Sequence, residues 1–176
     1  MARLFARRFN RIYNIDYFKE PQSFHFADKA VKVPGLDGSG KMGKSEGNCI
    51  YLCDDEKTVT KKIMRAVTDQ GPTQLNQEKP EVIQNLFAFC ELISGKEAAD
   101  YYNDLYNNMQ IRYGDMKKQI AADCNALLNP IRERIEAYAS DEALLDSIMR
   151  QGAEAASARA EKTIEEVRQI IGFRAL

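Results

Sequence analysis

The stretch from residue 33 to residue 48 concentrates the residues whose types and spacing could do chemistry. It reads V-P-G-L-D-G-S-G-K-M-G-K-S-E-G-N and holds five of the ten glycines in the chain. Glycine-rich backbone leaves amide N–H groups free to face an anion, and Lys41 and Lys44 add two mobile positive charges. With the hydroxyl of Ser45, these donors suit the oxygens of a phosphate. The alternative is a solvent-exposed turn whose lysines have no ligand.

The same stretch also satisfies the formula of a P-loop. Residues 38–45 read G-S-G-K-M-G-K-S, which fits G-x-x-x-x-G-K-[ST]. A P-loop lies between a buried strand and a helix that opens at its Lys-Ser pair. Here Pro34 and Gly35 interrupt the chain before the pattern, and residues 49–52 after it favour a strand over a helix. We therefore interpret the P-loop match as coincidental.

A different signature fits this stretch better. Residues 41–45, K-M-G-K-S, resemble the K-M-S-K-S signature of class I aminoacyl-tRNA synthetases, and the surrounding sequence is similar to the tryptophanyl-tRNA synthetase family. The similar segments are P-G-L-D-G (34–38), E-G-N (46–48), residues 54–69 ending in A-V-T-D, K-P-E-V-I-Q-N-L (79–86), Y-G (113–114), N-P-I-R-E-R (129–134) and G-A-E-x-A (152–156). The resemblance runs through nearly the whole chain. Gly43 departs from it, because the family has serine there.

The resemblance implies a tryptophan–tRNA ligase, which activates tryptophan with ATP and Mg²⁺ and transfers it to tRNA(Trp). By this resemblance Lys41 and Lys44 are the catalytic residues, meeting the negative charge of the departing pyrophosphate. The implied ATP-binding residues are Val33, Lys41, Met42, Gly43, Lys44 and Ser45, with Val33 offering its backbone to the adenine. The other ATP signature of the family, a His-x-Gly-His-type turn, has no counterpart here. We therefore expect a C-terminal fragment that is inactive alone.

The sequence predicts a mainly α fold. From residue 54 onward the apolar residues recur with a period of about 3.6. This pattern predicts helices that begin at Asp54, at Pro80 and at Asp141, a short helix over 98–105, a long helix over 116–138 that bends at Pro130, and a last helix over 156–171, all packed as a bundle. Residues 24–33 and 50–52 are the plausible strands, too few for a stable sheet.

The resemblance also implies a division into domains. Residues 1–52 are expected to be the tail of a Rossmann-like α/β catalytic domain that ends in the signature loop. Residues 53–176 are expected to be a helical domain that binds the tRNA anticodon. Residues 1–13 alternate arginines with apolar residues at helical spacing, which is typical of a mitochondrial presequence or of an amphipathic helix. Because serines are lacking, we prefer the helix of a folded domain.

The charge distribution and the cysteine content limit which ligands and which cellular compartment we expect for this chain. Residues 1–65 carry a net charge of +5 and residues 66–176 carry −6, so phosphate chemistry is sought in the first third and any RNA contact must be local. The basic pairs considered for RNA contact are Lys117/Lys118, Arg132/Arg134 and Arg159/Lys162. The four cysteines (Cys49, Cys53, Cys90, Cys124) and the single His25 lack the spacing of a zinc site. Reduced thiols and the absence of a run that could span a membrane predict a cytoplasmic protein.

Two other readings of the function stay open. A tyrosyl-tRNA synthetase shares the fold, and amino-acid activation by the intact protein would separate the two. A non-catalytic helical RNA-binding module would use the glycine-rich stretch only as a linker. The family enzymes are homodimers, but much of that interface is expected outside this chain, so a monomeric fragment is also consistent with the sequence.

Overall fold

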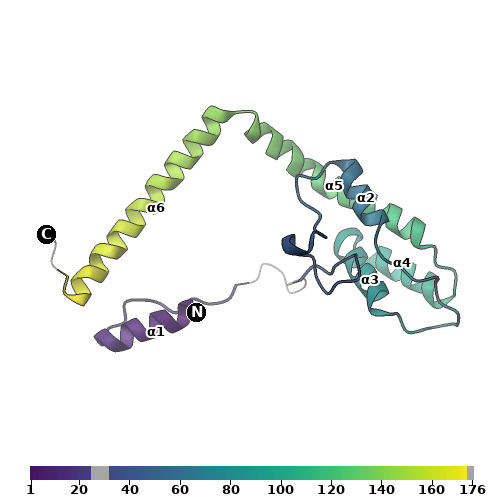
Figure 1. Cartoon of the computed structure of the whole chain (residues 1–176), viewed down its shortest axis with the longest axis horizontal. Coiled ribbons are helices and arrows are strands. Elements are labelled where there is room, and N and C mark those ends of the chain that lie inside the picture. Colours follow the sequence, from purple (N-terminus) through teal and green to yellow (C-terminus); the bar gives the residue numbers. More distant parts are fainter. Residues whose placement is uncertain (25–31, 174–176) are drawn as a thin grey trace. The chain divides into compact units, whose positions relative to one another are not determined.

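The regular structure of this chain is helical throughout the part that the structure describes. The computed structural model describes residues 1–24 and 32–173 (Figure 1). Its elements are α1 (Ala2–Tyr13), the short 3₁₀ turn η1 (Lys44–Glu46), α2 (Glu56–Met64), α3 (Glu81–Ser94), α4 (Lys96–Asn107), α5 (Tyr113–Ala139) and α6 (Glu142–Ile171). The prediction of a mainly α fold is confirmed.

The predicted strand at residues 50–52 is wrong. Tyr51 donates its backbone N–H to a carboxylate oxygen of Asp54 at 2.8 Å, and Asp54 N–H returns a bond to the Tyr51 carbonyl at 3.0 Å. This turn satisfies the backbone groups that a strand would have paired with a neighbour. It also engages Asp54, so the side chain that caps α2 is that of Asp55, which accepts from Thr58 N–H. The other predicted strand, 24–33, lies mostly outside the described residues.

The chain divides into two compact units. One consists of Met1–Asp28 with Asp141–Leu176, and the other of Lys29–Ser140. The glycine- and lysine-rich stretch therefore belongs to the same unit as α2, α3, α4 and α5. The expected domain boundary between residues 52 and 53 stays a prediction.

The core of the second unit is built where α5 packs against α2 and α3, and where α3 packs against α4. The largest fully buried side chains are those of Val59, Ile63, Ile83, Leu86, Cys90, Tyr106, Met116 and Ile120. Pro80 precedes α3 and Gly95 follows it, so the predicted limits of this helix are confirmed. Leu86, Phe89 and Cys90 of α3 are buried as predicted, whereas Ile83 is buried in place of the predicted Val82.

The helix α5 continues through Pro130, as predicted. Its buried face ends earlier than predicted, because Leu128 is 4% exposed whereas Ile135 and Tyr138 are 40% and 48% exposed. Met116, Ile120 and Cys124 are buried as predicted, but Leu128 is buried in place of the predicted Leu127, which is 55% exposed. From residue 133 to its end, every residue of α5 is therefore exposed.

The last two predicted helices form one helix, α6, which belongs to the first unit and not to the unit that holds α2, α3, α4 and α5. No described residue of α6 is buried, and Leu144, Leu145, Ile148 and Met149 are exposed. The predicted break was wrong because a single glycine, Gly152, costs only about 1 kcal/mol in a helix otherwise rich in alanine and glutamate. Asp141 caps the N-terminus as predicted, accepting from Leu144 N–H at 2.9 Å.

Replacing Gly152 with alanine is expected to stabilise α6. A Cβ atom added at Gly152 would meet no atom within 4 Å, and alanine removes the backbone entropy penalty of glycine. A gain of roughly 0.5–1 kcal/mol should slow amide hydrogen exchange in the middle of α6 about two- to fivefold. Gly172→Ala is the matched control with the opposite sign, because Gly172 ends the helix at φ +83°. Equal effects from both variants would contradict the explanation.

In the first unit, α1 is the amphipathic helix predicted for the N-terminus. Arg7 forms a two-pronged ion pair with Glu20 at 2.5 and 2.6 Å, and the side chain of Asn10 accepts the backbone N–H groups of Tyr17 and Phe18. Tyr17 also donates its hydroxyl to Glu166 of α6 at 2.6 Å. Among the residues described, no helix is both long enough and apolar enough to cross a bilayer.

Candidate phosphate-binding loop

The base of the stretch 33–48, called here the glycine–lysine loop, is fixed to the helical unit. The carbonyl of Leu36 accepts the N–H of Val67 at 2.7 Å, and the side chain of Leu36 is buried. Val33 and Met42 pack against the core, and Met42 N–H donates to the Val33 carbonyl at 2.9 Å. The two arms of the loop are thus joined at their base. The expected contact of the Val33 backbone with adenine stays a prediction.

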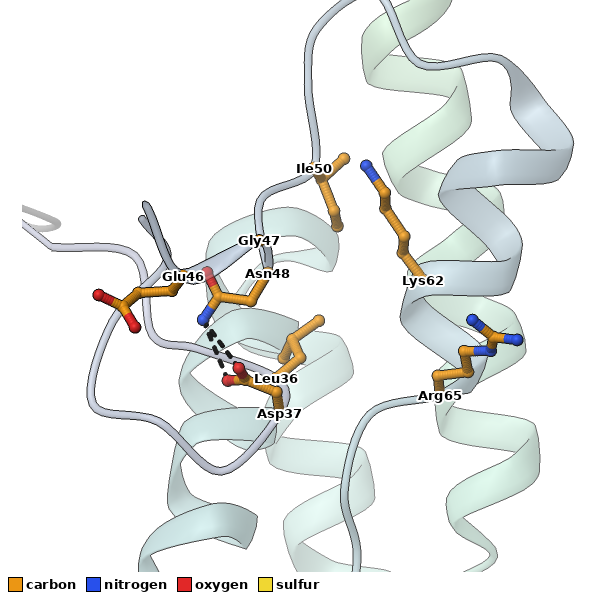
Figure 2. Close-up of a pocket in the computed structure, with 8 residues that line it drawn as sticks. All are labelled: Leu36, Asp37, Glu46, Gly47, Asn48, Ile50, Lys62 and Arg65. Atoms are coloured by element: carbon orange, nitrogen blue, oxygen red, sulfur yellow. Dashed lines mark hydrogen bonds between the residues drawn. The ribbon is translucent and has the colours of Figure 1, made fainter. Parts of the chain in front are cut away.

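One side chain, that of Asn48, links several parts of the loop. Its Oδ1 accepts the N–H of Gly43 at 2.9 Å. Its Nδ2 lies 3.0 and 3.1 Å from the two carboxylate oxygens of Asp37 (Figure 2). The same atom lies 2.7 Å from Ser39 Oγ and 3.2 Å from the Lys41 carbonyl. We call Asp37, Ser39 and Asn48 the clasp.

The carboxylate of Asp37 is the acceptor at the centre of the clasp. It accepts the hydroxyl of Ser39 at 2.6 Å and the backbone N–H of Ser39 at 3.1 Å, in addition to Nδ2 of Asn48. Donors aimed at the ionised carboxylate favour it, so the Ser39 and Asn48 side chains lower the pKa of Asp37 to about 2. The clasp is therefore fully formed at neutral pH.

The residues predicted to bind phosphate lie at the tip of the loop. Lys41 and Lys44 are exposed, and no described residue forms an ion pair or hydrogen bond with either ammonium group. Lys44 opens η1, which is three residues long and ends at Gly47 with φ +68°. Ser45 is exposed with its hydroxyl 3.4 Å from a Glu46 carboxylate oxygen. A P-loop would need an α-helix at Lys44, and the chain instead leaves η1 without regular structure.

Behind the loop lies a pocket of about 320 Å³, shown in Figure 2. It is lined by Leu36, Asp37, Glu46, Gly47, Asn48, Ile50, Lys62 and Arg65. Lys62 is already occupied there, because its ammonium donates to the Cys49 carbonyl at 2.8 Å and to Asp54 at 2.5 Å. Asp37 and Asn48 of the clasp line one side of this pocket, and Lys62 of α2 and Arg65 at the end of that helix line the other.

The A-V-T-D segment fixes the loop base to α5. Lys117 donates its buried ammonium to the Ala66 carbonyl at 2.7 Å, and Asp69 accepts the hydroxyl of Tyr113 at 2.8 Å. Burial lowers the pKa of Lys117; burial and then the bond to Asp69 raise the pKa of Tyr113. Since Val67 of the same segment binds Leu36, these motif residues position the loop.

Two of the residues predicted to contact RNA are engaged inside the fold. Lys117 is only 8% exposed, so its prediction as an RNA contact is wrong. Arg132 donates to the Asp54 carbonyl at 3.1 Å and to Asn125 at 3.0 and 3.1 Å, where it joins α5 to the start of α2. The other four, Lys118, Arg134, Arg159 and Lys162, are exposed and stay predictions.

The sequence analysis did not single out Asn48 and Asp37 as site residues. The signal was present, because Asp37 lies in P-G-L-D-G and Asn48 ends E-G-N, both segments of the family resemblance. A short polar side chain within a glycine-rich loop often bonds to the backbone of that loop. Only the folded loop shows which backbone groups these two residues reach.

Gly43 is a position where serine should be tolerated. Its φ of −150° and ψ of 140° are open to any residue, and an added Cβ would meet the flexible side chain of Glu46 at 3.3 Å and the Ser45 hydroxyl at 3.8 Å. We expect Gly43→Ser to change stability by no more than a few tenths of a kcal/mol. Gly47→Ser, at φ +68°, should cost about 1–2 kcal/mol. Chemical denaturation of both variants tests this, and equal losses would show that position 43 requires glycine.

The chain matches the family model described as "tRNA synthetases class I (W and Y)" over residues 1–129. It therefore belongs to this family of class I aminoacyl-tRNA synthetases.

Individual relatives are more specific. The chain is 59% identical to the tryptophan–tRNA ligase of Porphyromonas gingivalis over 174 residues, which is 99% of this chain and 53% of that protein. It is 36% identical to the tryptophan–tRNA ligase of Streptococcus pyogenes over 178 residues, 98% of this chain and 52% of that protein. The chain thus spans about half the length of the curated relatives it matches.

Solved structures share the fold. The crystal structure of tryptophanyl-tRNA synthetase from Campylobacter jejuni matches with a TM-score of 0.70 and 25% identity, covering 97% of this chain and 52% of that one. The same enzyme complexed with ADP and tryptophan matches with a TM-score of 0.71 and 24% identity over the same shares. The helical arrangement described above is therefore one that this family uses.

Proposed function

We propose that the whole protein containing this chain is a tryptophan–tRNA ligase. The observation that supports this most strongly is the 59% identity to a tryptophan–tRNA ligase through nearly the full chain, the glycine–lysine loop included. In the proposed reaction the tryptophan carboxylate attacks the α-phosphorus of ATP, which gives tryptophanyl-adenylate and pyrophosphate. The terminal ribose of tRNA(Trp) then takes the aminoacyl group.

Lys41 and Lys44 have the chemistry to act on the first step. Negative charge accumulates on the pyrophosphate as its bond to the α-phosphorus breaks, and cations placed beside that charge lower the barrier. Both ammonium groups are exposed and carry no internal ion pair among the described residues, so they are available to phosphate oxygens. Ser45, beside Lys44, is proposed to donate its hydroxyl to a phosphate oxygen, and Met42 and Gly43 to shape the tip between the lysines.

Mg²⁺ is proposed to accompany ATP and to share the charge of its phosphates. No group of three or more metal-binding side chains occurs in the described part of the chain, and the loop acid Asp37 is bonded within the clasp. These residues therefore suit a cation that is held mainly by the phosphates. Lys41 and Lys44 would add their positive charge to that of the cation.

The remaining assignments follow from the same proposal. Residues 1–52 belong to the catalytic domain and residues 53–176 to the tRNA-binding helical domain. The exposed residues Lys118, Arg134, Arg159 and Lys162 are the candidate contacts with tRNA. The whole protein is a homodimer that works in the cytoplasm.

Amino-acid-dependent exchange between pyrophosphate and ATP tests the proposed function. The full-length protein is incubated with ATP, Mg²⁺ and labelled pyrophosphate, with tryptophan or tyrosine in parallel. We expect exchange that depends on tryptophan. Exchange that depends on tyrosine would assign the protein to the tyrosyl enzymes of the same family. Exchange with neither amino acid would overturn the proposal and favour a non-catalytic RNA-binding module.

A further inference from the structure

We propose that Asn48 is a positioning residue, which holds the glycine–lysine loop in its phosphate-binding shape before ATP arrives, with Asp37 and Ser39 as its supports. This inference rests on the proposed function, because it concerns how the same loop is organised. It adds residues outside the K-M-G-K-S motif to the working parts of the site.

The Asn48 side chain reaches two backbone groups at the tip of the loop. Its acceptor atom takes the N–H of Gly43, and its donor atom lies beside the carbonyl of Lys41. Met42 is the one residue between those two backbone groups, so a single amide fixes the backbone on both sides of it. Lys41 carries one of these groups, and Lys44 follows Gly43 directly. Asn48 thereby sets where both lysine side chains leave the backbone.

Position 48 requires a side chain with both a hydrogen-bond donor and an acceptor. The backbone of the tip offers an N–H donor at Gly43 and a carbonyl acceptor at Lys41, and a side-chain amide presents its acceptor and its donor on two separate atoms, whereas a hydroxyl has one oxygen for both roles. Aspartate would bond to Gly43 alone and would repel Asp37. Alanine would bond to neither. Asn48 is also partly buried against the pocket wall, so its bonds are partly shielded from water.

The clasp restrains a loop whose backbone is otherwise flexible. Glycines at 38, 40, 43 and 47 give the loop many backbone conformations. Beyond the joined base at Val33 and Met42, the bonds that restrain the tip are mainly those of the clasp. A loop that is ordered in advance does not lose this conformational freedom when the phosphates bind.

The test uses full-length protein and the kinetics of tryptophan-dependent pyrophosphate exchange. We expect Asn48→Ala to raise KM for ATP about tenfold and to lower kcat about tenfold, with KM for tryptophan unchanged. A purely structural role would instead lower the amount of folded enzyme and leave KM for ATP as it was. The control is Asn108→Ala, since Asn108 is an exposed asparagine at the end of α4 whose side chain donates to the Asp104 carbonyl. It should match the wild type within twofold.

Exchanging the carboxylate and the amide between positions 37 and 48 gives a second test. Asn48→Asp places a second carboxylate against Asp37 and should reduce activity more than Asn48→Ala. Adding Asp37→Asn restores one donor and one acceptor across the same gap, so the double variant should recover at least tenfold over Asn48→Asp. Failure of the double variant to recover, together with a normal KM for ATP in Asn48→Ala, would overturn the inference while leaving the proposed function in place.

A measurement that does not depend on catalysis distinguishes the inference about Asn48 from the proposed ligase function. Hydrogen exchange of the Gly43 amide in the full-length protein should be at least tenfold faster in Asn48→Ala than in the wild type, because its acceptor is gone. An unchanged rate would overturn the inference even if the protein activates no amino acid. A faster rate in a protein without exchange activity would support the clasp and overturn only the proposed function.

Discussion

Replacing Lys44 with alanine in the full-length protein is expected to slow the formation of tryptophanyl-adenylate about a hundred- to a thousandfold. Lys44 lies at the start of η1 with its ammonium exposed and unpaired among the described residues, so its charge is available to the departing pyrophosphate. The affinity for tryptophan should stay unchanged, because the role proposed for this lysine concerns phosphate charge that develops in the transition state. Pyrophosphate exchange at saturating tryptophan, combined with equilibrium dialysis of tryptophan, measures both quantities.

The matched control for this prediction is Lys57→Ala. Lys57 is an exposed lysine of α2 outside the loop, and its loss should change the exchange rate by less than twofold. Lys41→Ala should be impaired, but less than Lys44→Ala. Equal exchange rates for Lys44→Ala and the wild type would remove the proposed role of the loop.

Replacing Lys117 with alanine is expected to lower the free energy of unfolding by about 2–4 kcal/mol. The buried ammonium donates to the Ala66 carbonyl, and its removal leaves that carbonyl without its partner and a space beside α5. The neighbouring Val67 N–H, which binds Leu36, should then be less well held. Urea unfolding followed by circular dichroism measures the loss.

The adjacent lysine provides the comparison for Lys117. Lys118 is exposed and lies 3.8 Å from Asp115, so Lys118→Ala should change the free energy of unfolding by less than about 0.5 kcal/mol. A stable Lys117→Ala variant that binds tRNA more weakly would contradict the structural role and would restore Lys117 as an RNA contact.

Much of the fold could be predicted from apolar periodicity, but periodicity does not say whether an apolar face has a partner. The pattern at Met116 and Ile120 predicted buried positions, because α2 and α3 cover that face of α5. The pattern at Leu144 and Ile148 is as regular, yet these residues of α6 are exposed. Packing depends on the other elements that reach a face, and the spacing of residues within one helix does not contain that information.

The motif of the site could be predicted from the sequence, but the hydrogen bonds within the site could not. Lys41, Lys44 and Ser45 could be found from their types and spacing. The bond between Asp37 and Asn48 joins residues eleven positions apart across a turn whose geometry no local pattern specifies. Charge alone was also misleading, because Lys117 looks like a surface lysine in the sequence but is buried in the fold, where the Ala66 carbonyl accepts from its ammonium.

The base of the glycine–lysine loop is attached to the helical unit, and this attachment determines the expected product of limited proteolysis. A trypsin cut after Lys44 would sever the chain at an exposed tip, yet Val33, Leu36 and Met42 on one side of the cut remain packed on the same helices as Ile50 on the other. The nicked protein should therefore elute from a sizing column as one particle and separate into two peptides only in denaturant.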